Sequence, residues 1–259
     1  AGALSVNPTE LDYHEADDAL YALFPRCGML ARISGDGTVL NSWVTTDGTD
    51  LFQEAGDTPL CPAEVIIEGA APTIDASPLE KWPSVLVSSG NELFIGFDSR
   101  LSTADDLVHV TMDGTPLFTA LTVEAGTKGW RRLRVSPETR WGRFLYGVTK
   151  AGDVRVFRMS DLVECDTNAD TRALDPLTIE SEQRGCVPNG TLPRIFTAKV
   201  PGIVTTKNRK IIDVGFFTFT EPDDTLDYEE KSSFLGTFAI LLTMDGIVFL
   251  VNLDEEFPE

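Results

Sequence analysis

The feature that most constrains the fold of this chain is a strand–turn–strand pattern that recurs along it. The clearest copy covers residues 143–157 and turns at Gly152-Asp153, and a second copy covers residues 238–251 and turns at Asp245-Gly246. Two β-rich segments around a Gly/Asp turn are the strongest short-range indication of a hairpin. Similar turns begin at positions 36, 90 and 113, and segments with helical periodicity are nearly absent. The sequence therefore predicts an all-β protein.

The spacing of these turns bears on the architecture. Intervals between successive turns are irregular, whereas a regular propeller repeats about every 40–50 residues, one four-stranded blade per repeat. We expect a small or partial β-propeller, with a double-sheet β-sandwich or jelly roll as the alternative. Residues 1–28 are expected to form an N-terminal extension with a short helix that begins after Thr9, and residues 29–259 the β domain. Polar, acidic loop inserts are expected at residues 161–194 and 220–233.

One stretch carries a resemblance to known families. The segments Leu133–Pro137, Phe144–Val148 and Gly152–Phe157 resemble one β-propeller blade of the WD-repeat kind. The same stretch is similar to a tachylectin-type blade, through Gly129-Trp130 and Leu145–Thr149. The likeness covers residues 129–159, with a weaker echo at 237–252; no Trp-Asp dipeptide occurs, and Gly-Trp occurs once. The resemblance implies the propeller architecture, and its tachylectin side implies carbohydrate binding.

The charge balance excludes some partners. Among 259 residues, 41 acidic residues oppose 21 basic ones, which gives a net charge of -20. A chain this acidic is repelled by a phosphate backbone, so we expect no nucleic-acid partner. No segment reaches the roughly 18 consecutive apolar residues of a membrane span, so we expect no membrane insertion.

Positive charge is concentrated in one window. Residues 131–158 hold eight basic and two acidic residues. We expect a basic surface that docks a protein partner or a second copy of the chain, with the acidic insert as a complement that would permit head-to-tail assembly. The alternative is that these arginines pair with surrounding carboxylates. The residues predicted to bind a partner are Arg131, Arg132, Arg134, Arg143, Arg155 and Arg158.

The cysteines bear on the compartment. Four cysteines show no CxxC spacing, which argues against a zinc site. Cys165 and Cys186 bracket one polar loop and are a candidate disulfide, and a glycosylation sequon follows at Asn189-Gly190-Thr191. These features favour an extracellular or particle-associated setting, and four free thiols with a chance sequon are the alternative.

Chemistry-bearing residues are sparse. The loop at residues 166–170 places oxygen ligands at alternating positions, so calcium is the candidate cofactor, with a polar Asx-turn loop as the alternative. The chain has two histidines: His109 is expected in a strand as a structural residue, and His14 is expected at the surface. No nucleophile elbow and no phosphate loop occurs, so we expect no enzymatic activity. The predicted calcium ligands are Asp166, Asn168, Asp170 and Asp175, and the tryptophans that could stack on a ligand are Trp43, Trp82, Trp130 and Trp141. Packing in a core is the alternative for the tryptophans.

Taken together, these features favour a non-enzymatic binding or assembly module, a structural subunit that contacts protein partners through its loop faces and its Arg-rich blade. A secreted carbohydrate-binding lectin is the first alternative, because of the sequon, the cysteines and the tachylectin-like blade. A calcium-dependent propeller hydrolase is the second, and it depends on the acidic loop alone.

Overall fold

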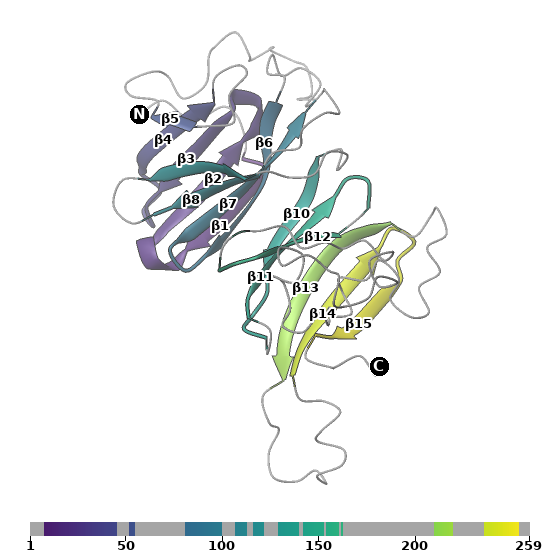
Figure 1. Cartoon of the computed structure of the whole chain (residues 1–259). Coiled ribbons are helices and arrows are strands. Elements are labelled where there is room, and N and C mark those ends of the chain that lie inside the picture. Colours follow the sequence, from purple (N-terminus) through teal and green to yellow (C-terminus); the bar gives the residue numbers. More distant parts are fainter. Residues whose placement is uncertain are drawn as a thin grey trace, which may run out of the picture. The chain divides into compact units, whose positions relative to one another are not determined.

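The computed structural model of the chain consists mostly of antiparallel strands (Figure 1). It describes residues 8–45, 52–54, 81–99, 107–112, 116–121, 129–139, 142–152, 154–160, 162, 210–219 and 236–253. The strands form four antiparallel sheets, which confirms the all-β prediction. Within these residues, no helix has the length and apolar character needed to cross a membrane.

The chain divides into two compact units, Ala1–Leu133 and Arg134–Glu259, and the division falls within strand β10. The first unit holds a five-stranded sheet, β1-β2-β3-β4-β5, and a four-stranded sheet, β6-β7-β8-β9. The strands of these two sheets are β1 (Glu10–His14), β2 (Ala19–Phe24), β3 (Met29–Ile33), β4 (Val39–Thr45), β5 (Phe52–Glu54), β6 (Lys81–Ser89), β7 (Glu92–Ser99), β8 (Leu107–Thr111) and β9 (Leu117–Leu121).

Two three-stranded sheets follow along the chain, β10-β11-β12 and β13-β14-β15. In every sheet the hydrogen-bonded neighbours are consecutive strands, so each sheet is a simple meander. The strands are β10 (Trp130–Val135), β11 (Phe144–Thr149), β12 (Val154–Arg158), β13 (Ile211–Phe219), β14 (Gly236–Thr243) and β15 (Val248–Asn252).

The hairpins expected from the turn residues form at the predicted places. β11 pairs with β12 around Gly152, and β14 pairs with β15 around Gly246. Both glycines have a positive φ, 97° and 80°, which side-chain-bearing residues rarely adopt. The hairpins β3–β4, β6–β7 and β8–β9 also form as expected. Local turn chemistry therefore identified these five hairpins correctly.

The expected N-terminal helix is wrong. Residues 10–14 and 19–24 form β1 and β2, joined by the short 3-10 turn η1 (Glu15–Asp17), and a second such turn, η2 (Pro25–Cys27), precedes β3. β2 pairs with β3 over Leu20–Phe24, and five of its six residues are buried. β1 is also held from the other sheet, because the hydroxyl of Ser88 in β6 donates to the carbonyl oxygen of Tyr13 at 2.8 Å. Strand pairing thus outweighs the acidic pattern that suggested a helix start.

Each unit has its own core. In the first unit, one face of β1–β5 packs on the sheet β6–β9, with Tyr21, Leu23 and Trp43 from the first sheet against Ile95 and Phe97 from the second. In the second unit, β11 and β12 pack on β13–β15. The buried residues of that core are Phe144, Tyr146, Val148, Val156, Val214, Ala239, Leu241 and Leu253.

Candidate functional site

The six predicted docking arginines are distributed over both units. Arg131 and Arg132 belong to the first unit, and Arg134, Arg143, Arg155 and Arg158 belong to the second. Arg132 forms an ion pair with Glu10 of β1, as the alternative interpretation expected for these arginines. Arg155 lies opposite Gly147 and Arg158 opposite Phe144 on β11, and their odd spacing directs them to opposite faces of the sheet. β12 therefore does not present these two arginines on one surface.

The tryptophans occupy cores. Trp43, Trp82 and Trp130 are 6%, 7% and 0% exposed, and Trp141 lies outside the described residues. Trp43 contacts Phe118 edge-to-face, and Trp130 lies so close to Gly96 that a Cβ there would come within 2.8 Å of its ring. Because their rings are enclosed by protein, these three tryptophans offer no face for a sugar to stack on. This placement agrees with burial in a core, the alternative to stacking on a ligand at the surface.

Other predicted features lie outside the described residues. These are the candidate calcium ligands Asp166, Asn168, Asp170 and Asp175, the candidate disulfide partners Cys165 and Cys186, the sequon and most of the acidic inserts. Among the residues that the structure does describe, no cluster of three or more His, Cys, Asp or Glu side chains could hold a metal ion. Cys27 is disulfide-bonded.

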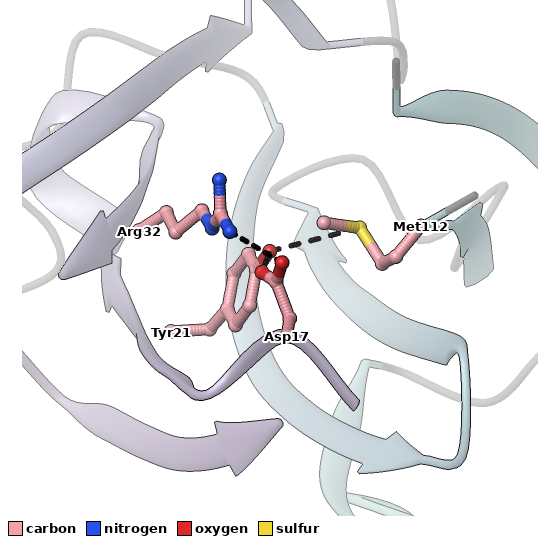
Figure 2. Close-up of polar contacts among 4 residues, drawn as sticks. All are labelled: Asp17, Tyr21, Arg32 and Met112. Atoms are coloured by element: carbon pink, nitrogen blue, oxygen red, sulfur yellow. Dashed lines mark hydrogen bonds and ion pairs between the residues drawn. The ribbon is translucent and has the colours of Figure 1, made fainter. Parts of the chain in front are cut away.

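A polar cluster that the sequence did not predict lies beside η1 (Figure 2). The carboxylate of Asp17 accepts a hydrogen bond from the hydroxyl of Tyr21 at 2.6 Å and forms an ion pair with Arg32. The Tyr21 oxygen also lies 3.8 Å from the sulfur of Met112, in the segment after β8. Burial, followed by the hydrogen bond to Asp17, raises the pKa of Tyr21, so its hydroxyl remains a donor. The contacts of Asp17 link Tyr21 of β2 to Arg32 of β3, while the buried Nε atom of Arg32 has no hydrogen-bond partner.

His14 lies next to this cluster and is buried, not exposed as expected. Its side chain is 1% exposed, and its ring meets Tyr21 edge-on with the centroids 5.7 Å apart. Neither ring nitrogen has a hydrogen-bond partner. Burial lowers the pKa of His14; Asp17 and Asp12 oppose that effect, and Arg32 adds to it. The imidazole is therefore neutral at physiological pH.

His109 has the structural position that the sequence suggested. Its ring stacks on Phe94 with the centroids 5.0 Å apart, and its Nε2 atom lies 3.2 Å from a carboxylate oxygen of Glu92. Burial lowers the pKa of His109, and Glu92 opposes that effect. Packing on a neighbouring strand explains this histidine without a catalytic role.

The most distinctive surface of the described residues is one face of the sheet β13–β15. Ile240 and Leu250 lie directly opposite each other on β14 and β15, and Leu242 and Val248 form the next pair on the same face. Leu250 and Val248 are each 61% exposed and Ile240 is 37% exposed. Met244, 67% exposed, follows in the turn. We call Ile240, Leu242, Met244, Val248 and Leu250 the apolar face.

The opposite side of the same sheet explains why this face remains uncovered. Val214, Ala239 and Leu241 alternate with the residues of the apolar face and are buried in the core of the second unit. Alternation along a strand directs successive side chains to opposite faces, so a sheet that packs on one side usually carries polar residues on the other. On β14 and β15 the side chains on both sides are apolar at these positions. The sequence shows these apolar residues on β14 and β15 without polar residues between them. It does not show which of them the core buries and which remain exposed.

Contiguous exposed apolar side chains on a folded domain are typical of interaction sites. The apolar face includes no nucleophile, base or metal-ligating group, so it is suited to recognition and not to chemistry.

No protein-family model matches the chain, and no curated protein is similar to it in sequence.

Proposed function

We propose that this protein is a non-enzymatic binding module that docks a protein partner on the apolar face of β14 and β15. The observation that carries the proposal is the exposure of Leu250, Val248 and Ile240 on two paired strands whose other side forms a core. Each buried methylene contributes about 0.8 kcal/mol, so covering these side chains would supply a substantial part of a binding free energy.

The architecture we propose for this module is a partial β-propeller. All four sheets are meanders of consecutive strands, the arrangement of propeller blades. A jelly roll or Greek-key sandwich would place non-consecutive strands side by side within a sheet. The sheet order among the described strands therefore favours the propeller over the sandwich.

Basic residues on β10 that belong to the first unit are a separate candidate contact for a protein partner. Arg131 is exposed on β10, whereas Arg132 on the same strand forms the ion pair with Glu10. A charge reversal at Arg132 would disturb the fold as well as any partner contact. Arg131→Glu is therefore the variant that tests whether this strand contributes to docking.

The two alternative functions receive less support. Carbohydrate binding was favoured by the sequon, the cysteines and the tachylectin-like blade, but three of the four tryptophans predicted to stack on a sugar are buried. The calcium-dependent hydrolase depended on a loop that lies outside the described residues. A glycan array tests the first alternative directly, and a screen of lactone and ester substrates with and without calcium tests the second.

Selection from a phage library of random dodecapeptides tests the proposed function. We expect enriched peptides to bind the wild-type chain and to bind Ile240→Ser/Leu250→Ser at least about tenfold more weakly. Leu117→Ser is the matched control, because Leu117 is 64% exposed on β9 in the other unit. If no peptide is enriched, or if the double variant binds as well as the wild type, the proposal is wrong.

A further inference from the structure

We infer that the partner of the apolar face is an extended, positively charged segment that adds as a new strand to the free edge of β15. This inference rests on the proposed function, since it names the kind of partner and its mode of binding. It goes further because it depends on the backbone of β15 as well as on its side chains.

The hydrogen-bond register of β14 and β15 identifies which backbone groups face outward. The amide of Thr243 donates to the carbonyl oxygen of Ile247, and the amide of Leu253 donates to that of Thr237. In an antiparallel ladder, hydrogen-bonded pairs alternate with non-bonded pairs. The pairs between Ile240 and Leu250 and between Leu242 and Val248 are therefore non-bonded ones. Consequently Val248, Leu250 and Asn252 direct their N–H and C=O groups away from β14.

These outward groups face an open edge. β15 ends the order β13-β14-β15, and none of the strands that the structure describes pairs with its other side. The side chains of Val248 and Leu250 also belong to the apolar face. A strand laid along this edge would thus gain backbone hydrogen bonds, and every second side chain would extend the apolar face. Such strand addition obtains affinity from the main chain and specificity from alternate side chains.

β15 also lacks the features that protect sheet edges from such pairing. Natural edge strands carry charged residues, proline or bulges, or are very short. Apart from β9, the other described edge strands show these features: acidic residues on β1, three residues only in β5, Pro83 and a bulge in β6, arginines on β10 and β12, and a bulge in β13. β15 reads Val-Phe-Leu-Val-Asn, with no charge, no proline and no bulge. β9 is similarly unprotected, but its strongly exposed apolar residue is Leu117 alone.

Charge favours a basic partner over a second copy of the chain. Asp213 lies on the same face as Leu242, and Asp245 lies in the turn between β14 and β15. Two copies that met edge to edge would each carry a net charge of -20 and would repel one another. A strand with lysine or arginine at its ends would instead be attracted, and the attraction would weaken as salt rises.

The probes are short synthetic strands. We would measure binding of acetyl-Lys-Val-Thr-Val-Thr-Val-Lys-amide to the full chain by fluorescence anisotropy. A second peptide carries Glu in place of both Lys residues. A third has the Lys-ended sequence with N-methyl groups on the amides of one edge, which removes donors without changing side chains. We expect the Lys-ended peptide to bind, and each of the other two to bind about tenfold or more weakly.

A pair of variants of the protein itself tests the backbone groups at the edge of β15. Val248→Pro removes one outward N–H at the first residue of β15, where proline is compatible with a strand. Val248→Thr is the matched control, because it keeps that N–H and a β-branched side chain. We expect Val248→Pro to lose most of the binding and Val248→Thr to keep most of it, with unchanged circular dichroism spectra for both.

The outcomes separate this inference from the proposed function. Binding that survives N-methylation or Val248→Pro overturns strand addition. Strand addition is also overturned if the Lys-ended strand fails to bind while library-selected peptides still bind. In each of these cases the proposed function stands. Equal affinity for the Glu-ended peptide overturns the basic partner. A concentration-dependent dimer that Val248→Pro abolishes identifies a second copy as the occupant and overturns the inference. If neither the strands nor any library peptide binds, both proposals are wrong.

Discussion

Ile240 and Leu250 lie directly opposite each other on β14 and β15, and both side chains face solvent. Ala239 and Leu241, which flank Ile240 on β14, are buried on the other side of the sheet. At these positions β14 and β15 are therefore apolar on both sides, and the core of the second unit covers one of them. This relationship separates residues that stabilise the fold from residues that remain available for a partner, and the two sets should respond differently to substitution.

Substitutions on the apolar face should leave stability almost unchanged. Leu250→Ser alters a side chain that is 61% exposed, so we expect the free energy of unfolding to change by less than about 0.5 kcal/mol. Leu241→Ala removes a side chain that is 1% exposed, and we expect a loss of about 2–5 kcal/mol. Urea denaturation of both variants measures the difference. Equal losses would show that Leu250 belongs to a core.

Tyr21→Phe should destabilise the first unit. The change removes the hydroxyl that donates to Asp17 at 2.6 Å, and we expect a loss of about 1–2 kcal/mol in the free energy of unfolding. Tyr13→Phe is the control, since the Tyr13 hydroxyl donates to Asp18 from a side chain that is 51% exposed. That variant should change stability by less than about 0.5 kcal/mol. A larger effect at Tyr13 than at Tyr21 would contradict the assignment.

Stability should fall in mildly acidic solution because of His14. Burial holds the folded-state pKa of His14 below the usual 6.5, so the unfolded chain takes up the proton first. The contribution of His14 is therefore complete above pH 6.5 and is lost as the pH falls from there towards the folded-state pKa, at up to about 1.4 kcal/mol per pH unit.

Denaturation of the wild type and of His14→Phe between pH 5 and 7.5 measures this dependence, and we expect a flatter profile for the variant. His109 has a pKa lowered in the same direction, so the His109→Phe variant separates the two contributions. If His14→Phe keeps the full wild-type slope, His14 is not the group that titrates.

A methyl group at Gly96 should be poorly tolerated. A Cβ there would lie 2.8 Å from ring carbon Cγ of Trp130 and 2.8 Å from a methyl carbon of Val85, both in the core of the first unit. We expect Gly96→Ala to cost about 1–3 kcal/mol through overpacking. Gly215→Ala on β13 is the matched control, because nothing lies within 4 Å of its Cβ position. Thermal unfolding of the two variants measures the difference, and equal melting temperatures would refute the close packing of Gly96 against Trp130.

Part of this structure could be predicted because it depends on neighbours in the chain. Gly152 and Gly246 mark hairpins since a positive φ is accessible to glycine, and the flanking β-rich segments have no competing helical pattern. The strands around them formed where expected, and the all-β class followed. The N-terminal helix was wrong because the pairing of β2 with β3 is a contact that an acidic local pattern does not encode.

The residues around the candidate site could not be placed from the sequence, because their positions depend on contacts between residues distant in the chain. The sequence left both a ligand surface and a core open for Trp130, and its packing against Gly96 places it in the core. His14 came from an acidic segment that suggested exposure, yet Tyr21 covers it. Asp17, Tyr21 and Arg32 form no recognisable motif, because strand pairing brings them together.

The sequence by itself determined the all-β class, the positions of five hairpins and the acidic charge, since these follow from turn conformations, alternation and composition. Only the tertiary structure decided which apolar residues are buried. Phe238–Leu242 and Val248–Val251 have no polar residue to mark an outer face, so alternation left two equivalent sides. One side packs on β11 and β12 and is buried, so Ile240, Val248 and Leu250 on the other side are exposed.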